Sequence, residues 1–482
     1  MRICDIISPD EYLFSEVNTE LTFNKITMDI STAGEEDILI IPNSLKMPVI
    51  SDQAPPLVTI CDTNASLPDF FATIRVRNPR LAMAKAFYRF EQIDLSRVKL
   101  IGVTGTNGKS GTSEFIKKVL SECGHKVGFI GTGKIEIDGK IISDKYYSMT
   151  TPDPPLLYRS IKEMQLYGCD TIVMEVSSHA LALDKLAPLT FDYGILTNLS
   201  KEHMDFHINM ESYFSEKKKL FSMCHCGVFN IDDEYGKRAY AQAKGRRIAA
   251  GILWRGDVWA SNIENYGLNG ISYIYHQSNF SFKMKLKTAG IYNAYNSMLA
   301  AAVCIDMGCK PCDVKQILGN IDCISGRFEI INDKVSVIID YAHTDIAFNN
   351  IMKELSAIKG DKYLSVVFGC GGDRDKEKRP KMAKIAERYA NSVFVTTDNS
   401  RSEDARNIIA DITRGFEGGR YQVIENRKDA IRTAILTAND GDIIAIIGKG
   451  CEGYFIDKEG YHDYNEKEII RNALSERRVF SK

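Results

Sequence analysis

Gly-Val-Thr-Gly-Thr-Asn-Gly-Lys-Ser, residues 102–110, is the stretch that decides the fold of this chain. It follows an apolar run, residues 98–103, that predicts a buried strand, and it precedes residues 112–120, whose apolar spacing is helical. A glycine-rich turn between a strand and a helix lets backbone N–H groups surround the phosphates of a nucleotide. We therefore predict a phosphate-binding loop in which Lys109 reaches the β- and γ-phosphates and the Ser110 hydroxyl holds Mg²⁺.

The glycine spacing of this loop departs from the usual pattern. That pattern has a glycine five residues before Gly108, where this chain has Val103, and the glycine lies one residue earlier, at Gly102. An incidental glycine turn is the alternative interpretation. The preceding strand, the following helix and the Lys-Ser pair together favour nucleotide binding.

Length and composition define the broad class of protein. A chain of 482 residues is too long for one core, and at about 150 residues per domain it predicts about three domains. The net charge of −2 gives no reason to expect nucleic acid or an anionic membrane as a partner. The chain shows no long apolar run and no signal-peptide core, and its 12 cysteines are scattered. We expect a cytoplasmic protein with reduced thiols and no membrane insertion.

The alternation of strands and helices predicts an α/β fold in three domains. Residues 1–97 form a small mixed α/β domain, and residues 98–325 form a central domain with a largely parallel sheet flanked by helices. Residues 326–482 alternate again, which suits a Rossmann-like domain without the G-x-G-x-x-G turn of dinucleotide sites.

Three residues of the central domain could support metal or phosphate chemistry. Glu175 ends an apolar strand, where parallel sheets bind ligands, and its carboxylate could hold Mg²⁺. His203 lies in a loop after the next strand and could bind a metal as a neutral imidazole. For both, a structural role is the alternative. Lys217 begins a Lys-Lys-Lys run, which composition alone assigns to a solvated helix face.

Three strand ends of the last domain carry complementary charges. Residues 369–375, 397–401 and 448–452 each follow an apolar strand, and together they offer arginine, aspartate, asparagine, glycine and glutamate. Arginine binds carboxylates with two hydrogen bonds, and acids bind ammonium groups. These three turns therefore predict a site for a zwitterion.

In combination, these motifs resemble the Mur ligase family, and within it the muramyl-tripeptide synthetases. The likeness runs from about residue 98 to the C-terminus, and the family's phosphate loop shares the nine-residue spacing seen here. The motifs that carry it are Thr104–Ser110, Thr150-Thr151-Pro152, Glu175–His179, Thr197-Asn198-Leu199, Gly326–Glu329, Asp340–Thr344, Gly371–Arg374 and Gly448-Lys449-Gly450. The resemblance implies an N-terminal domain for a UDP-linked substrate, a central ATP-binding domain and a C-terminal amino-acid-binding domain.

The resemblance also implies a reaction in peptidoglycan precursor synthesis. ATP phosphorylates the D-Glu γ-carboxylate of UDP-MurNAc-L-Ala-D-Glu, and the amine of a diamino acid attacks the acyl phosphate to form an amide. Mg²⁺ and Lys109 offset the charge that develops during phosphoryl transfer. Lys217 would be carbamylated and would support Mg²⁺, with Lys218 or Lys219 as alternatives if the register shifts. We expect a monomer that acts on small molecules.

Roles for individual residues follow from the matched motifs. The nucleotide would contact Gly105, Thr106, Asn107, Gly108, Lys109, Ser110, Gly111, Asn296, Arg327, Asp340 and His343. The muramyl dipeptide and the amino acid would contact Thr150, Thr151, Ser177, Lys185, Arg374, Asp398, Asn399, Ser400, Arg401, Gly448 and Glu452. The metal ligands would be Ser110, Glu175, His203 and Lys217, and the catalytic residues Lys109, His203 and Lys217.

The motif that selects the amino acid is Asp398-Asn399-Ser400-Arg401, where family members that add meso-diaminopimelate have Asp-Asn-Pro-Arg. Because Arg401 needs a carboxylate partner, we expect diaminopimelate rather than L-lysine.

The first domain departs most from the family. Asp29-Ile30-Ser31 and Glu36–Ile41 stand where Asp-Ser-Arg and Gly-Asp-Leu-Phe-Val-Ala are usual, and a Gly/His-rich loop is missing. Lys185 and Cys451 replace a common Arg and His. Two alternatives follow: a paralogue that acts on another carboxylate, and a nucleotide-binding protein without catalysis. The loop that contains His203 argues against the nucleotide-binding protein, because such a protein has no need of a second metal-binding loop.

Overall fold

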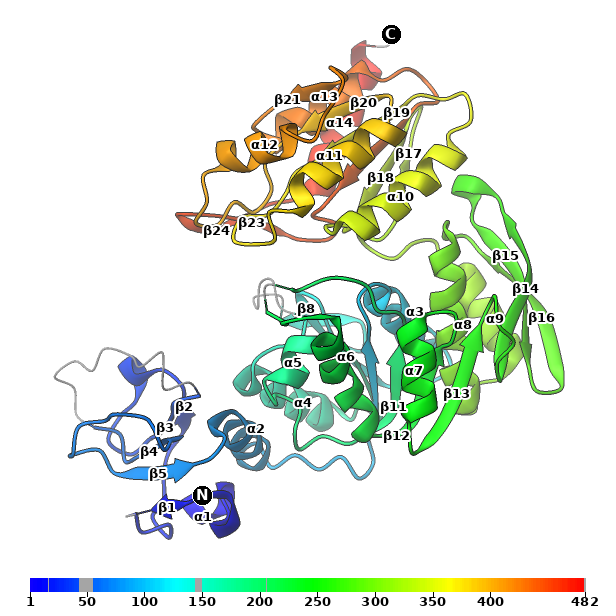
Figure 1. Ribbon diagram of the computed structural model, residues 1–482. Coiled ribbons are helices and arrows are strands. Elements are labelled where there is room, and N and C mark those ends of the chain that lie inside the picture. Colours follow the sequence, from blue (N-terminus) through cyan, green and yellow to red (C-terminus); the bar gives the residue numbers. More distant parts are fainter. Residues whose placement is uncertain (16, 43–54, 144–149, 205, 481–482) are drawn as a thin grey trace.

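The computed structural model describes residues 1–15, 17–42, 55–143, 150–204 and 206–480, and Figure 1 shows their arrangement. Three α/β units follow one another along the chain, each built on its own main sheet. The domain boundaries that we propose, after residues 97 and 325, fall in the stretches between these sheets.

The N-terminal sheet has the strand order β1-β5-β4-β3-β2, and β1 is the antiparallel edge strand. Its strands are β1 (Phe14–Ser15), β2 (Ile26–Thr27), β3 (Ile38–Ile40), β4 (Val58–Asp62) and β5 (Thr73–Val76). The helices are α1 (Ile3–Ile6) and α2 (Pro79–Phe90). Buried residues of α2 share a core with Leu157 and Ile161 of the central domain, and the Tyr88 and Tyr158 rings lie 5.9 Å apart. Helix α2 therefore joins the two domains (Figure 1).

The central sheet has the order β16-β15-β14-β13-β12-β11-β6-β10-β7-β8-β9. From β7 to β14 the neighbours are parallel, and antiparallel strands extend both ends. The parallel strands are β6 (Lys99–Thr104), β7 (Val127–Gly131), β10 (Thr171–Glu175), β11 (Phe191–Leu196), β12 (Cys224–Asn230), β13 (Arg246–Gly251) and β14 (Val258–Asn265). The extensions are β8 (Lys134–Ile137), β9 (Lys140–Ser143), β15 (Ile271–Gln277) and β16 (Phe280–Leu286).

Both faces of the central sheet are covered, which explains why its middle strands are largely apolar. Leu100 of β6 packs into the core on the side of α2 and α4, and Ile101 packs into the core on the side of α3 and α8. The helices are α3 (Lys109–Glu122), α4 (Pro154–Tyr167), α5 (Ser178–Ala182), α6 (Met210–Lys218), α7 (Glu234–Gln242), α8 (Ile291–Asp306) and α9 (Pro311–Asn320).

The C-terminal sheet has the order β17-β18-β22-β19-β20-β21, in which only the β17–β18 pair is antiparallel among the described strands. Its strands are β17 (Glu329–Asn332), β18 (Ser336–Asp340), β19 (Leu364–Phe368), β20 (Ser392–Val395), β21 (Tyr421–Val423) and β22 (Ile443–Ile447). Five helices and a hairpin accompany it among the described residues: α10 (Asp345–Ile358), α11 (Lys378–Tyr389), α12 (Ala405–Thr413), α13 (Arg427–Thr437), α14 (Glu466–Phe480), β23 (Tyr454–Asp457) and β24 (Gly460–Asp463).

Two expectations about the chain can be compared with its structure. All 12 cysteines are free thiols. In the part of the chain that the structure describes, no helix combines the length and the apolar character that crossing a membrane requires.

Candidate active site between the central and C-terminal domains

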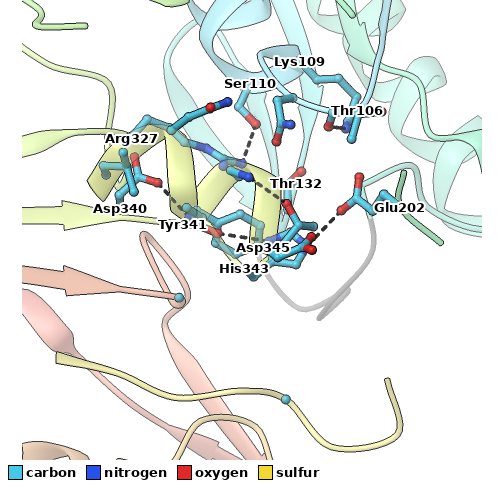
Figure 2. Close-up of a pocket in the computed structure, with 18 of the residues that line it drawn as sticks. Thr106, Lys109, Ser110, Thr132, Glu202, Arg327, Asp340, Tyr341, His343 and Asp345 are labelled. Atoms are coloured by element: carbon cyan, nitrogen blue, oxygen red, sulfur yellow. Dashed lines mark hydrogen bonds and ion pairs between the residues drawn. The ribbon is translucent and has the colours of Figure 1, made fainter. Parts of the chain in front are cut away.

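A cavity of about 320 Å³ opens between the central and C-terminal domains. The central domain supplies the loops after β6 and β11, and the C-terminal domain supplies the loops after β18, β19, β20 and β22. Figure 2 shows residues of both domains lining this space. The ends of parallel strands therefore meet here, which is where open α/β sheets bind ligands.

The loop after β6 has the form of a phosphate cradle. Gly105 and Gly108 have φ angles of +148° and +84°, in the region that favours glycine. A Cβ on Gly108 would lie 2.6 Å from Asn296 Oδ1 of α8, so a larger residue here would displace the Asn296 side chain. The Lys109 ammonium folds back and donates to the carbonyls of Gly105 (2.9 Å) and Thr106 (2.8 Å). The loop fits a triphosphate, with Lys109 and Asn296 at its wall.

Behind the cradle, hydroxyl groups converge on the Glu175 carboxylate. Ser110 Oγ donates to Glu175 Oε2 at 3.0 Å, and Thr132 donates to the same oxygen through Oγ1 at 3.0 Å. Arg327 of the C-terminal domain donates to Ser110 Oγ at 3.1 Å (Figure 2). An all-oxygen set of one carboxylate and hydroxyl groups suits Mg²⁺, which takes its other ligands from phosphates and water. Thr132 belongs to no motif in the sequence, and only the fold brings it here.

The expected ligands do not form a ready-made metal cluster. Among the residues that the structure describes, no three His, Cys, Asp or Glu side chains gather closely enough to hold a metal ion. Glu175 is only 2% exposed and stands behind Ser110 rather than in the cavity wall, whereas His203 lines the cavity. Any magnesium site here must draw on substrate phosphates as well as on protein ligands.

The loop after β11 contributes His203 and its neighbour Glu202. His203 has a φ angle of +56°, a left-handed conformation that is costly for a residue other than glycine. Burial lowers the pKa of His203 to about 3, so its imidazole is neutral and can act as a ligand. Asp205 of the same loop lies outside the described residues.

Glu202, which we did not single out in the sequence, links the two domains. Its carboxylate lies 3.1 Å from His343 Nε2 (Figure 2). It also lies 3.8 Å from His203 Nε2. Burial alone would raise the pKa of Glu202, but the hydrogen bond from His343 and the positive charge of Lys109 hold it below its usual range. In the sequence, Glu202 could have been recognised as a candidate site residue only from its place beside His203 in a loop that follows a strand.

Lys217 is buried, whereas Lys218 and Lys219 face outward. The Lys217 side chain is 2% exposed, and its Nζ donates to the Gly105 carbonyl at 2.9 Å. Lys218 donates to Gln242, and Lys219 pairs with Glu216 at 2.6 Å. The interpretation of Lys217 as part of a solvated face is therefore wrong, because it lies against the phosphate loop, just behind the cavity wall. Burial and the Lys109 charge lower its pKa well below the usual range.

The remaining residues that we expect to contact the nucleotide belong to the C-terminal domain. Arg327 stacks over the Tyr341 ring at 4.4 Å, and His343 lines the cavity. The Asp340 carboxylate accepts from the backbone N–H groups of Phe328 and Ala342, both at 2.7 Å. Asp340 therefore holds the two turns that carry Arg327 and His343.

The expected muramyl-dipeptide contacts lie on the central domain. Thr150 lines the cavity, and its hydroxyl oxygen lies 3.2 Å from Thr132 Oγ1. Thr151 and Ser177 have hydroxyls 3.4 Å apart, next to the end of β10. Lys185 pairs with Asp153 at 2.7 Å. Thr151, Ser177 and Lys185 are not among the residues that line the cavity.

The three charged turns of the C-terminal domain come together at one wall of the cavity. The lining residues among them include Arg374, Asp398, Asn399, Arg401, Gly448 and Glu452. Ser400 does not line the cavity, because its carbonyl packs against Gly372, where a Cβ would lie 1.9 Å away. Arg401 has a φ angle of +53° and donates through Nη1 to the Gly372 carbonyl at 2.8 Å.

The unusual polar motif of the N-terminal domain is satisfied locally. Asp29 accepts from the Ser31 backbone N–H at 2.9 Å and from the Ser31 hydroxyl at 2.7 Å. The segment after Ile41, where the family's Gly/His-rich loop would stand, lies largely outside the described residues.

Comparison with known proteins identifies relatives of both domains that form the cavity. The model of the Mur ligase middle domain matches residues 103–304, and the model of the Mur ligase glutamate ligase domain matches residues 326–450. The chain is 36% identical over 408 residues to UDP-N-acetylmuramoyl-L-alanyl-D-glutamate–2,6-diaminopimelate ligase 1 of Clostridium acetobutylicum, covering 84% of this chain and 83% of the relative. The corresponding ligase of Clostridioides difficile is 38% identical over 410 residues, covering 83% and 84%.

Solved structures share the fold. A UDP-N-acetylmuramoyl-L-alanyl-D-glutamate–2,6-diaminopimelate ligase aligns with a TM-score of 0.66 and 24% identity, over 99% of both chains. A folylpolyglutamate synthase from Mycobacterium tuberculosis aligns with a TM-score of 0.65 and 17% identity, over 83% of this chain and 95% of that chain.

Proposed function

Because this chain belongs to the Mur ligase family, we propose that it is the ATP-dependent ligase that joins meso-diaminopimelate to UDP-MurNAc-L-Ala-D-Glu in peptidoglycan precursor synthesis. One observation carries the proposal: a phosphate cradle and a charged amino-acid pocket share one cavity between two domains. A nucleotide-binding protein without catalysis has no need of this second pocket.

The proposed reaction has two steps, formation of an acyl phosphate and formation of the amide. An oxygen of the D-Glu γ-carboxylate attacks the γ-phosphorus of ATP, so that an acyl phosphate forms and ADP leaves. The amine nitrogen then attacks the acyl carbon, inorganic phosphate leaves, and the nitrogen loses a proton to give the amide.

We assign the groups of the cavity to these steps by their charge and position. Lys109 moves from its own loop carbonyls onto the β- and γ-phosphates, and Arg327 approaches the same phosphates from the C-terminal domain. Mg²⁺ supplies charge neutralisation when bound, with Ser110, Glu175 and His203 as the residues that would hold it. The link between Glu202 and His343 holds the two domains together around the substrates.

We further propose that Lys217 is carbamylated. Its amine is buried against the phosphate loop, and the lowered pKa favours the neutral form that adds to CO₂. Addition of the neutral amine to CO₂ forms an N–C bond and releases one proton, so that the side chain becomes a carboxylate-like anion. That anion would support the neighbouring metal ligands.

Diaminopimelate is favoured over L-lysine by the charge of the pocket. Arg374 and Arg401 line the same wall as Asp398 and Glu452. Arg401 uses Nη1 to bind backbone carbonyls, which fixes the plane of its guanidinium toward the cavity. A second carboxylate on the incoming amino acid gives these arginines a partner that lysine lacks.

An assay with the UDP-linked dipeptide, ATP, Mg²⁺ and a panel of amines tests the proposal. We expect phosphate release and a product of the tripeptide mass, with kcat/KM higher for diaminopimelate than for lysine. Arg401→Ala should raise the KM for diaminopimelate about tenfold and leave the value for lysine nearly unchanged. Absence of product with every amine would contradict the function, and an unchanged KM in Arg401→Ala would contradict the specificity argument.

A second candidate function is the same chemistry on another carboxylate. The atypical N-terminal domain favours it, because the middle-domain model matches only from residue 103 onward and Asp29 is engaged by Ser31. A paralogue of this kind would convert ATP to ADP and form an amide only when its own carboxylate substrate is present.

We propose that the enzyme acts as a cytoplasmic monomer, where ATP and UDP-linked precursors are available. Its free thiols suit a reducing compartment.

A further inference from the structure

A buried lysine lies directly behind the amino-acid pocket. Lys449 follows β22, the strand between β18 and β19, and its side chain is 1% exposed. It is not among the residues that line the cavity, although its neighbours Gly448 and Glu452 are. Lys449 therefore cannot touch a substrate directly in this arrangement.

The Lys449 ammonium instead contacts the pocket residues from behind. Nζ donates to Asn399 Oδ1 at 2.8 Å and to Glu452 Oε2 at 3.3 Å, and it pairs with Asp398 Oδ1 at 3.5 Å. These three partners come from two different strand-end turns. One cation thus ties together the turn after β20 and the turn after β22.

These contacts determine which way the Asn399 amide faces. Asn399 Oδ1 accepts from Lys449 Nζ and from the Ile456 backbone N–H at 3.0 Å, so the oxygen end is fully used. The Nδ2 end then donates to Glu452 Oε2 at 2.9 Å. Without the lysine, nothing on the oxygen side except Ile456 N–H would favour this orientation over the flipped one.

Glu452 is held in the same network. Its Oε2 accepts from Lys449 and Asn399, and its Oε1 accepts from the Tyr341 hydroxyl at 3.2 Å. Burial alone would raise the pKa of Asp398, but the charges of Lys449 and Arg427 lower it to about 2. Lys449 therefore holds both carboxylates in place in the wall of the pocket.

We propose that Lys449 is a positioning residue for the incoming amino acid: it orients Asn399 and holds the carboxylates of Asp398 and Glu452 in place, so that they can receive the ammonium groups of the substrate. The inference rests on the proposed function, because it assigns the amino-acid substrate to this wall. It predicts an effect on the amino acid that is separate from any effect on ATP, whose cradle belongs to the other domain.

The test compares Lys449→Met with Arg477→Met in the full-length enzyme. Arg477 is a buried cation of the same domain, 8% exposed and paired with Asp440 at 2.7 Å, and its variant controls for the loss of a buried charge. We expect Lys449→Met to raise the KM for diaminopimelate about tenfold or more, with the KM for ATP changed less than twofold. Arg477→Met should lower thermal stability without changing the KM for diaminopimelate.

The outcomes separate the inference from the function. Equal increases in both KM values, an unchanged KM for diaminopimelate, or the same increase in Arg477→Met would overturn the positioning role. Failure of the unmutated enzyme to use any amine would overturn the proposed function instead. If Lys449→Met does not fold, Lys449→Gln takes its place, because glutamine retains a donor for Asn399 without the charge. We expect Lys449→Gln to raise the KM for diaminopimelate severalfold. A wild-type KM for diaminopimelate in that variant would overturn the inference.

Discussion

Replacing Lys109 with methionine should lower kcat about 10²- to 10³-fold while the protein stays folded. The methionine keeps the length of the side chain and removes the charge that offsets phosphoryl transfer. Within the described residues the ammonium donates to carbonyls of its own loop, Gly105 and Thr106, and takes part in no ion pair that its loss would break. The measurement is phosphate release at saturating dipeptide and diaminopimelate, together with thermal unfolding.

Lys118 on the same helix supplies the matched control. Its side chain is 54% exposed and pairs with Glu122 at the surface. Lys118→Met should retain the wild-type kcat. A Lys109→Met enzyme with more than a tenth of the wild-type kcat would contradict the role of Lys109 in charge neutralisation.

Lys217→Ala should lower kcat about a hundredfold, whereas Lys218→Ala should retain the wild-type kcat. The two residues are adjacent in α6, but only Lys217 points into the protein, against the Gly105 carbonyl. If the carbamate supports the metal ligands, short carboxylates such as formate or acetate should restore part of the activity of Lys217→Ala.

A readout independent of activity is the carbamate itself. Enzyme equilibrated with ¹³C-bicarbonate should show a carbamate carbon signal by NMR, and Lys217→Ala should lack that signal. Wild-type kcat in Lys217→Ala, or the same signal in both proteins, would contradict carbamylation at this residue.

The parts of the fold that have strong local signals could be predicted from the sequence. The apolar run before the phosphate loop is β6 (Lys99–Thr104), and the helical spacing after it is α3 (Lys109–Glu122). The central parallel sheet follows from the same alternation of strands and helices. The antiparallel pairing of β14 with β15 and of β15 with β16 was not predicted, because it depends on hairpin register rather than on one apolar run.

The candidate site was predictable where a motif contains the chemistry. Lys109, Ser110 and Glu175 lie where a strand end or a glycine loop indicates a ligand. Glu202 gains its partner from His343, which is distant in the sequence, and no local pattern reveals such a pair. Thr132 likewise reaches Glu175 only because β7 and β10 are neighbours in the sheet.

The burial of individual charged residues was the property hardest to predict from the sequence. Lys217 and Lys449 are charged residues in a basic run and in a glycine-rich turn, and such residues are usually solvated. Here the helix α6 turns Lys217 toward the phosphate loop, and the position of β22 inside its sheet encloses Lys449. In both cases the surrounding fold, and not the local sequence, determines the environment of the amine.

The central claim is that this enzyme activates the D-Glu γ-carboxylate of the UDP-linked dipeptide by phosphorylation. The most direct measurement uses that dipeptide with both γ-carboxylate oxygens replaced by ¹⁸O, incubated with ATP, Mg²⁺ and meso-diaminopimelate. We expect one ¹⁸O atom in each released phosphate and one in the new amide carbonyl. Release of unlabelled phosphate, with the labelled dipeptide recovered intact, would contradict the claim.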